Sequence, residues 1–353
     1  MRWLQSLLID RADTPVSRAL AFVGVMARRW LGLSSSTQRR SPTPRLSVDC
    51  VSIDGNGGAG PCKRYRAIVA YDGTDFLGFQ AQDHRGLPVR TVQGALEAAV
   101  QRLVGSSSRV LGAGRTDAGV HASGQVIHVD LSVGRFGVHE LHRALNAVLP
   151  QDIRVLAFEA APDGFHARFS ALSRSYRYLI DNGPQATPSL RRIAWHVSSP
   201  LDVDAMNVAC QALVGLHDYV AFSVRGGDGP TMRRVLSAQV KIEFVNLTDP
   251  GESGNSEIMW HNPVPAVVGG PLRGRLISIE VEANAFLRQM MRRIVGSLVR
   301  VGRGWVPPSA VGEVLSRRIK ADAGPAAPAH GLDFFRVAYV DANMRGSSGW
   351  QRA

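Results

Sequence analysis

The stretch Leu111–Leu131 reads LGAGRTDAGVHASGQVIHVDL and places a turn between two strand-like runs. Its second run, GQVIHVDL, follows the period of two that favours a half-buried strand. The turn carries Arg115, Thr116 and Asp117 among glycines and alanines, which leave the backbone open to close approach by a ligand. The stretch therefore predicts a strand–turn–strand unit that presents charged side chains from its turn.

Strand-like and helical patterns alternate on both sides of this stretch. TVQGALEAAVQRLVG has apolar residues at helical spacing, with Thr91 as its N-cap and Gly105 at its end. A second helical pattern, VHELHRALNAVL, stops before Pro150. The strands of this part are predicted over 64–71 and 153–160. Residues 61–166 are therefore predicted to form one mixed α/β half.

Residues 167–345 show the same alternation and form a second predicted half. Its strands are expected over 175–181, 235–244, 275–283 and 333–340, and its helices over 204–216, 284–302 and 309–319. The Gly-, Pro- and Asn-rich segment 245–272 indicates a long insertion in a hairpin, because structureless loops of that length are uncommon in compact domains. Two such halves suggest an active cleft between them, with 346–353 as a tail.

The composition is that of a folded protein with a basic surface. Of the 353 residues, 45% are hydrophobic, which excludes wholesale disorder because enough apolar surface can be buried. The 41 Lys and Arg exceed the 29 Asp and Glu, giving a net charge of +12. This excess favours a polyanionic partner, since Lys and Arg bind phosphate backbones with release of counterions; a membrane surface is the alternative. Three cysteines are too few for a disulfide framework and fit a reducing compartment.

Residues 1–60 differ in composition from the rest of the chain. They hold eight arginines and no lysine against four aspartates, with the serine-rich run LSSSTQRRSPTP. This composition resembles an organellar transit peptide, and a disordered extension without an address is the alternative. The most apolar run, Ala19–Ala27, is too short to cross a bilayer, which takes about 20 residues. We therefore expect a protein of the chloroplast or mitochondrion, otherwise of the cytoplasm, with no membrane partner.

No pattern in the chain indicates a cofactor or a metal ion. A dinucleotide-binding loop near Gly112 would need glycine where Asp117 stands. His139 and His142 lie near one face of a predicted helix, but no third metal ligand follows at a recognisable spacing. We expect a reaction that uses neither.

Asp117 is the strongest candidate for chemistry. A lone Arg-x-Asp in a turn is usually a solvated turn in which the aspartate caps backbone amides. Here the guanidinium of Arg115, two residues away, is expected to pair with the carboxylate and keep it ionised. The pair therefore predicts a nucleophile or a base, and the plain turn remains the alternative.

The segment AGRTDAGVHASGQVIHV resembles the catalytic loop of the TruA-type tRNA pseudouridine synthases, in the form typical of their bacterial branch. Four further blocks resemble the family in the same order along the chain: YDGTDFLGFQAQ, FHARFSALSRSYRYLI, HDYVAFS and ANAFLRQMMRRIVGSL. The resemblance covers the chain from about residue 65 to about residue 340. It implies the α+β pseudouridine synthase fold, in which the two α/β halves share a mixed, largely antiparallel sheet with an active cleft between them.

The resemblance also implies roles for particular residues. Asp117 is implied as the catalytic aspartate, paired with Arg115, while Tyr176 lies over the target base and Arg292 completes a basic wall. The residues expected to contact the substrate are Gln80, Arg168, Leu287 and Arg288. From pattern alone, Tyr176 reads as a core residue of a strand, and Arg288 and Arg292 as a solvated basic face of a helix.

Other residues concern the expected contacts with RNA. Phe76 and Phe79 stand where the family usually has tyrosine and tryptophan, and the insertion 245–272 exceeds the bacterial pattern. The helix over 284–302 is expected to bury a stripe made of Leu287, Met291, Ile294 and Leu298. The arginines expected to line a groove for an RNA stem are Arg191, Arg192, Arg225, Arg233 and Arg234.

The function that the resemblance implies is a homodimeric tRNA uridine isomerase that needs no cofactor. It acts on the anticodon stem-loop, around positions 38 to 40. Asp117 either bonds to the sugar carbon C1′ or removes the 2′ proton, and the sequence leaves both routes open. A pseudouridine synthase for another RNA and a non-catalytic RNA-binding protein are the alternative functions.

Overall fold

The computed structural model describes residues 62–84, 87–132, 137–224, 229–243, 275–320 and 322–340. The predicted leader 1–60, the insertion 245–272, Arg225 and the tail 346–353 lie outside them. The strands of the first half are β1 (Lys63–Tyr71), β2 (Asp83–His84), β3 (Leu87–Pro88), β4 (Leu111–Gly112), β5 (His121–Leu131) and β6 (Ile153–Ala160). Those of the second half are β7 (Ala171–Asn182), β8 (Trp195–His196), β9 (Gly215–Asp218), β10 (Met232–Glu243), β11 (Arg275–Ala283) and β12 (Leu332–Tyr339).

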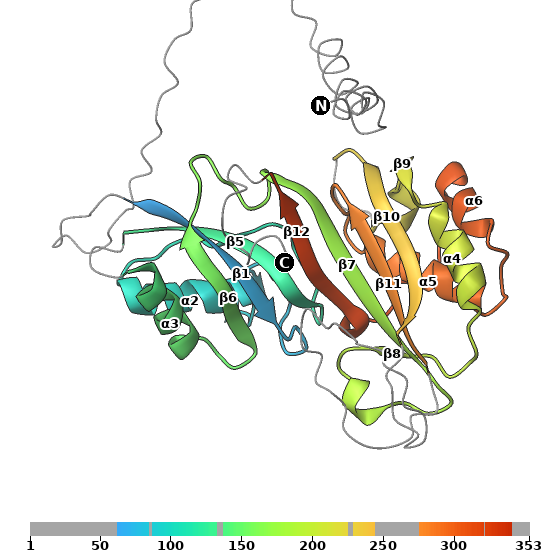
Figure 1. Cartoon of the computed structure of the whole chain (residues 1–353), viewed down its shortest axis with the longest axis horizontal. Coiled ribbons are helices and arrows are strands. Elements are labelled where there is room, and N and C mark those ends of the chain that lie inside the picture. The colour runs from blue at the N-terminus through green and yellow to red at the C-terminus, as the bar shows by residue number, and fades with distance from the viewer. Residues whose placement is uncertain are drawn as a thin grey trace, which may run out of the picture. The chain divides into compact units, whose positions relative to one another are not determined.

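One mixed sheet runs through both halves, with the strand order β6-β1-β5-β12-β7-β11-β10-β9. The last strand, β12, lies in the middle of it, parallel to β5 and antiparallel to β7, as Figure 1 shows. The other neighbours on this path pair antiparallel. The predicted α+β fold with a shared, largely antiparallel sheet is confirmed. Because β12 joins strands from both halves, residues far apart in sequence meet at the centre of the sheet.

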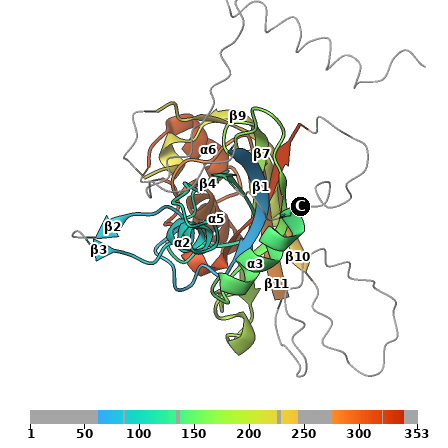
Figure 2. The ribbon, with the colours of Figure 1, turned by 90° about the vertical axis from the view of Figure 1, so that its left-hand side faces the viewer.

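The helices gather at the two ends of the sheet (Figure 1). At one end lie α2 (Val92–Val104) and α3 (Val138–Val148), and at the other lie α4 (Val203–Gln211), α5 (Met290–Gly302) and α6 (Ala310–Arg317). In the side view of Figure 2, the β2–β3 hairpin projects beyond α2. Among the described residues, no helix is long and apolar enough to span a membrane.

The local signals of the first half are confirmed. The Thr91 hydroxyl accepts a hydrogen bond from the Gly94 amide and caps α2, which ends at Gly105 in the left-handed region with φ 73°. His142, considered above as a metal ligand, is instead bonded through Nε2 to the Val155 carbonyl at 2.7 Å. That bond ties α3 to β6, so His142 has a structural partner.

Helix α5 supplies much of the core of the second half. The predicted stripe of Met291, Ile294 and Leu298 is buried. A Cβ at Gly296 would lie 1.9 Å from the Pro325 carbonyl oxygen, so only glycine lets the 322–328 segment pass this closely. The helix thus brings its first turn against a segment that precedes β12.

The predicted start of this helix is wrong. It begins at Met290 rather than at residue 284, because the Asn284 amide donates to the Arg234 carbonyl, Oδ1 of Asn284 accepts from the Arg234 amide, and Gln289 adopts a left-handed φ of 60°. Leu287 and Arg288 therefore lie in a turn before the helix. Leu287 is only partly buried and does not belong to the helical stripe, and Arg288 shares no helix face with Arg292.

The helix predicted over 204–216 also differs from the structure. It ends at Gln211, and Gly215–Asp218 forms the edge strand β9, paired with the start of β10. Gly215 has a φ of 116°, which a helix does not continue. Pairing with β10 satisfies backbone groups that would otherwise lie at a bare sheet edge.

Candidate active site

The turn that carries Asp117 connects β4 to β5 and is held by buried polar side chains. The Tyr71 hydroxyl lies 2.8 Å from the Thr116 hydroxyl, and Gln125 Nε2 donates to the Gly114 carbonyl at 2.8 Å. Tyr71, Thr116 and Gln125 are all buried. Since these bonds fix the backbone on both sides of Arg115, the turn presents Asp117 from a defined position.

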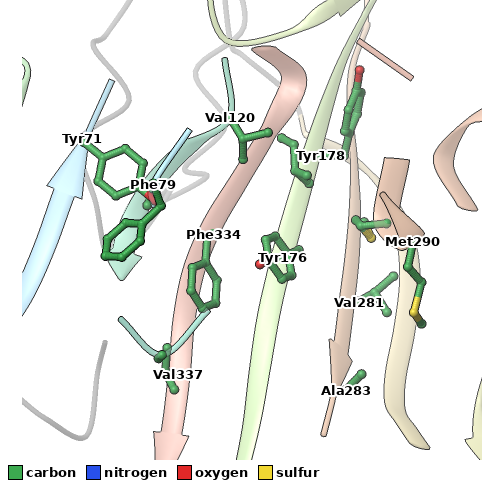
Figure 3. Close-up of a cluster of buried hydrophobic side chains, with 14 of the residues drawn as sticks. Tyr71, Phe79, Val120, Tyr176, Tyr178, Val281, Ala283, Met290, Phe334 and Val337 are labelled. Atoms are coloured by element: carbon green, nitrogen blue, oxygen red, sulfur yellow. The ribbon is translucent and has the colours of Figure 1, made fainter. Parts of the chain in front are cut away.

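A second turn, residues 73–79, packs against the first. The Phe79 amide donates to the Thr116 carbonyl at 3.1 Å, and the Gly119 amide donates to the Phe76 carbonyl at 3.3 Å. Phe76 and Phe79 are buried, and Figure 3 shows Phe79 beside Tyr71, with ring centroids 6.4 Å apart. These two phenylalanines, which differ from the usual aromatic pair of the family, are therefore packing residues beneath the turn.

The carboxylate of Asp117 pairs with Arg292, which lies in the first turn of α5. Arg292 Nη1 is 3.4 Å from Asp117 Oδ2, with 30% of the aspartate side chain and 16% of the arginine side chain exposed. Arg292 Nε donates to the Ala327 carbonyl at 2.7 Å, and the Ala327 amide donates back to the Arg292 carbonyl at 2.9 Å. This clamp aims the guanidinium at a carboxylate that solvent still reaches.

The predicted pairing of Arg115 with Asp117 is wrong. Arg115 is exposed, whereas Thr116 is buried and Asp117 is half-buried. Because Thr116 is anchored to Tyr71 below the turn, the turn leaves the Arg115 side chain in solvent, and the cation that pairs with Asp117 comes from the other half of the chain. The two halves therefore build the charged pair together.

Tyr176 lies on β7 at the centre of the sheet. Its ring is stacked on that of Phe334 from β12, with centroids 4.7 Å apart and planes 15° apart, as Figure 3 shows. Phe286, from the turn before α5, meets the same ring edge to face at 4.7 Å. Burial, with the charges of Tyr71 and Asp117, raises the pKa of Tyr176. Its phenol therefore stays protonated at neutral pH.

The other predicted substrate contacts form no bond with Asp117 in the part of the chain that the structure describes. Gln80 follows Phe79 and is half-buried. Arg168 is exposed in the turn between β6 and β7, with its guanidinium 5.7 Å from the centre of the Phe169 ring. Leu287 is half-buried, and Arg288 is exposed.

The sequence patterns did not identify Arg174 as a residue of this region. Arg174 lies on β7, is 9% exposed, and donates hydrogen bonds to backbone carbonyls around the site. The signal available in the sequence was a charged residue directly before the predicted strand 175–181, which has to be paired if that end of the strand is buried. The pattern did not indicate which segments it joins.

The arrangement suits chemistry by a carboxylate. Among the described residues, no three His, Cys, Asp or Glu side chains lie together as a metal site. The carboxylate of Asp117 is oriented by one arginine and half exposed, and a neutral phenol lies nearby. Such a group can add to an electrophilic carbon, stabilise positive charge there or accept a proton.

Comparison with known proteins assigns the chain to a family. A family model described as tRNA pseudouridine synthase matches residues 67–170 and 209–340. A tRNA pseudouridine synthase A from Chloroflexus aurantiacus is 44% identical over 280 residues, which cover 79% of this chain and 89% of that protein. Another, from Nitratidesulfovibrio vulgaris strain Miyazaki F, is 40% identical over 279 residues, covering 78% of this chain and 99% of that protein.

The ranges that the family model matches include the turn with Asp117 and the helix with Arg292, whereas the strand with Tyr176 lies between them. A third similar protein, the tRNA pseudouridine synthase A of Roseiflexus castenholzii, is 42% identical over 273 residues, covering 77% of this chain and 89% of its own. Since both the family model and these relatives span most of the chain, the protein belongs to the tRNA pseudouridine synthase family.

Proposed function

We propose that the protein isomerises uridine to pseudouridine in the anticodon stem-loop of tRNA, around positions 38 to 40, with Asp117 as the catalytic carboxylate. The observation that carries this proposal is the Asp117–Arg292 pair, which presents a partly exposed carboxylate at the junction of the two halves. The family of the chain supports the reaction, and the net charge of +12 supports an RNA substrate.

The reaction breaks the N1–C1′ bond of a uridine, turns the freed uracil and joins its C5 to C1′. C5 loses a proton in this step and N1 gains one, so the product is an isomer of the substrate. Asp117 acts at the sugar, either by bonding to C1′ or by removing the 2′ proton to give a glycal. Carboxylates play the first role at the anomeric carbon in retaining glycosidases. Arg292 engages Oδ2 of Asp117, so the pairing orients the carboxylate and leaves Oδ1 to meet the ribose.

Tyr176 is proposed to contact the uracil. Because burial raises the pKa of its phenol, it serves as a hydrogen-bond donor or as a packing surface rather than as a base. Tyr176→Phe separates these roles: loss of turnover with unchanged tRNA binding assigns the hydroxyl to proton donation. Unchanged turnover assigns the role to the ring.

The uridine has to leave its stem to reach Asp117, at a cost of a few kcal/mol that contacts with the RNA offset. The side chains of Arg115, Arg168 and Arg288 are exposed and are proposed to bind the RNA backbone. Arg191 and Arg192 are exposed on the loop before β8, where Arg192 Nη1 lies 3.7 Å from Asp72 Oδ2. These arginines extend the proposed tRNA-binding surface beyond the site.

Two further properties are proposed with this function. The protein acts as a homodimer whose subunits hold the tRNA together, and residues 1–60 direct it to the chloroplast or mitochondrion. Light scattering of the purified protein with and without tRNA measures the first; a monomer in both samples contradicts it. A fluorescent protein fused behind residues 1–60 measures the second, and a cytoplasmic signal contradicts it.

The proposed reaction is tested by incubating the purified protein with unmodified tRNA and mapping pseudouridines. The wild-type protein is expected to modify uridines around positions 38 to 40, and Asp117→Asn is expected to bind tRNA without modifying it. Asp75→Asn is a matched control, because Asp75 is an exposed acid on the neighbouring turn. Normal turnover by Asp117→Asn contradicts the proposal.

Mapping in cells that lack the protein separates the alternatives. Loss of pseudouridine at tRNA positions 38 to 40 supports the proposed substrate. Loss at other RNA sites identifies another substrate for the same chemistry, and no loss at all favours a non-catalytic RNA-binding protein.

A further inference from the structure

Arg174 is a buried cation whose hydrogen bonds to the described residues all go to backbone carbonyls. It lies on β7 two residues before Tyr176. Nε and Nη2 donate to the Ala113 carbonyl at 3.3 and 3.2 Å, and Nη1 donates to the Asn284 carbonyl at 2.8 Å and to the Ala171 carbonyl at 3.3 Å. Nη2 also donates to the carbonyl of Arg168. The planar fork of the guanidinium thus satisfies three separate stretches of chain.

No carboxylate of the described residues forms an ion pair with Arg174, so carbonyl dipoles alone balance its charge there. Burial lowers the pKa of this guanidinium, which reflects the cost of removing a cation from water. A hydrophobic residue would fill the same space at less cost. The bonds that the fork makes are therefore a reason for an arginine at this position.

The three stretches all carry residues of the proposed site. Ala113 leads directly into the turn with Asp117, and Asn284 begins the turn that leads into α5 and Arg292. The third carbonyl belongs to Arg168, in the turn before β7. Arg174 thus joins the backbone segments on which the two partners of the charged pair are mounted.

The three stretches differ in the hydrogen bonds that hold them besides those of Arg174. The turn of Arg168 is held independently, because His166 Nδ1 accepts from the Arg168 amide at 3.1 Å and His128 Nδ1 accepts from the Ala167 amide at 3.1 Å. Ala113 is bonded to β5 of its own half, and Asn284 to β10 of its own half. Among the hydrogen bonds of the described residues, those of Arg174 link the Ala113 stretch to the Asn284 stretch. Loss of Arg174 is expected to affect the charged pair more than the RNA-binding turn.

We propose that Arg174 is a positioning residue that fixes Asp117 relative to Arg292 by bonding to the Ala113 and Asn284 carbonyls. Within the described residues it forms no ion pair with Asp117 and acts through the backbone that carries the pair. The inference rests on the proposed function, because its consequence is a slower chemical step with nearly unchanged affinity for tRNA.

The test compares Arg174→Lys with Arg275→Lys. Lysine keeps the charge and loses the fork, so it cannot reach both carbonyls in the same way. Arg275 is a matched control, since its Nη2 bonds to neutral acceptors, Asn182 Oδ1 at 3.1 Å and the Leu201 carbonyl at 2.9 Å, away from Asp117. Single-turnover rate, Kd for tRNA and Tm are measured for both variants.

Arg174→Lys is expected to lower the single-turnover rate at least tenfold at temperatures well below its Tm, with Kd changed less than threefold. Arg275→Lys is expected to keep the rate within twofold even where its Tm falls. A rate for Arg174→Lys within threefold of wild type overturns the inference. So does a loss that appears in Kd rather than in the rate.

Hydrogen exchange of the wild-type protein provides a second measurement that needs no substitution. If Arg174 couples the two turns, the amides of 114–120 and 285–289 are expected to open with one common free energy. Independent opening overturns the inference. A wild-type protein that makes no pseudouridine contradicts the proposed function instead, and the exchange result then still decides whether Arg174 couples the turns.

Discussion

The two partners of the charged pair are mounted on regions that are stabilised in different ways. The turn of Asp117 is held by hydrogen bonds from buried polar side chains, including Tyr71 and Gln125. Helix α5, which carries Arg292, is held by apolar packing through buried residues such as Leu298. Hydrogen bonds are directional and contribute about 1 kcal/mol each, whereas a buried apolar side chain contributes about 1.5–3 kcal/mol without fixing a direction.

This difference indicates a division of roles between the two regions. Changes in the packing of α5 should lower the stability of the whole fold and leave the chemistry of folded molecules intact. Changes in the polar supports of the turn should cost less stability and alter the rate. Substitutions in each region test this division of roles.

The largest expected effect is on stability. Leu298→Ala removes a fully buried side chain and leaves a cavity, which should lower the free energy of unfolding by about 3–4 kcal/mol. Denaturant unfolding measures the loss, and turnover at low temperature should stay close to wild type. Val208→Ala on α4 is the control, because Val208 is 64% exposed and should cost less than about 0.5 kcal/mol. A tenfold drop in the rate of folded Leu298→Ala would contradict the division of roles.

The next largest effect is on rate. Arg292→Lys keeps the charge but cannot hold the Ala327 carbonyl and the Asp117 carboxylate together, because lysine lacks the planar fork. We expect a single-turnover rate about a hundredfold lower, equivalent to about 2.7 kcal/mol of transition-state stabilisation.

The neighbouring residue provides the control for that change. Within the described residues, the side chain of Arg293 makes long bonds, 3.4 Å each, to the Ala221 and Lys320 carbonyls. Arg293→Lys should therefore keep the rate within about threefold. Both variants keep the positive charge, so equal losses in them would mean that the effect does not come from the particular contacts of Arg292.

A third effect is a pH dependence of stability in the first half. Burial, with the charges of Arg64 and His166, lowers the pKa of His128 from its ordinary 6.5 to about 4. Between these values the unfolded chain binds a proton that the folded chain does not, so the free energy of unfolding falls as the pH is lowered through this window. We expect a loss of about 2–3 kcal/mol between pH 7 and pH 4 from this group.

The free energy of unfolding of His128→Asn, measured across the same pH range, checks this prediction. An asparagine oxygen can replace Nδ1 as the acceptor for the Ala167 amide without titrating, so the variant should show a flatter profile than wild type. His139→Asn is the control, because His139 is exposed on α3, and its profile should match wild type. Parallel profiles for His128→Asn and wild type would assign the acid sensitivity to other groups.

Much of the fold was predictable because its signals are local. The cap at Thr91, the end at Gly105 and the period-two runs specify their elements within a few residues. The start of α5 was missed because it depends on Asn284 pairing with Arg234, fifty residues away, which competes with a helical pattern that continues through residues 284–289. Tertiary contacts override local propensity at that point.

The candidate site, too, could be predicted from the sequence only in part. Asp117 was found because glycines around a charged turn are a local signal, and Arg292 came from the resemblance to the family. The pairing of Arg292 with Asp117 could not be predicted from the sequence, because Arg115, two residues from Asp117, is the simpler candidate when only spacing is known. Arg174 donates hydrogen bonds to the carbonyls of Ala113 and Asn284, which lie 61 and 110 positions away in the sequence. Every residue has a backbone carbonyl, so the sequence does not indicate which ones accept these bonds.

The smallest expected effect tests the polar supports directly. Tyr71→Phe removes a hydroxyl that bonds to Thr116 and leaves a buried hydroxyl without that partner, which should cost about 1–2 kcal/mol of stability. The rate should fall several-fold as well, because Thr116 precedes Asp117. Tyr219→Phe is the control, since it removes an equally buried hydroxyl that bonds to the Leu213 carbonyl in the other half. It should lose similar stability and keep its rate.

A double-mutant cycle shows whether the Tyr71–Thr116 bond itself is responsible. Thr116→Val keeps the shape of the side chain and removes its hydroxyl, so adding it to Tyr71→Phe should cost less than it does alone. Strict additivity in both stability and rate would mean that the two hydroxyls act independently. Gln125 and Arg174 would then be the polar side chains that hold the turn.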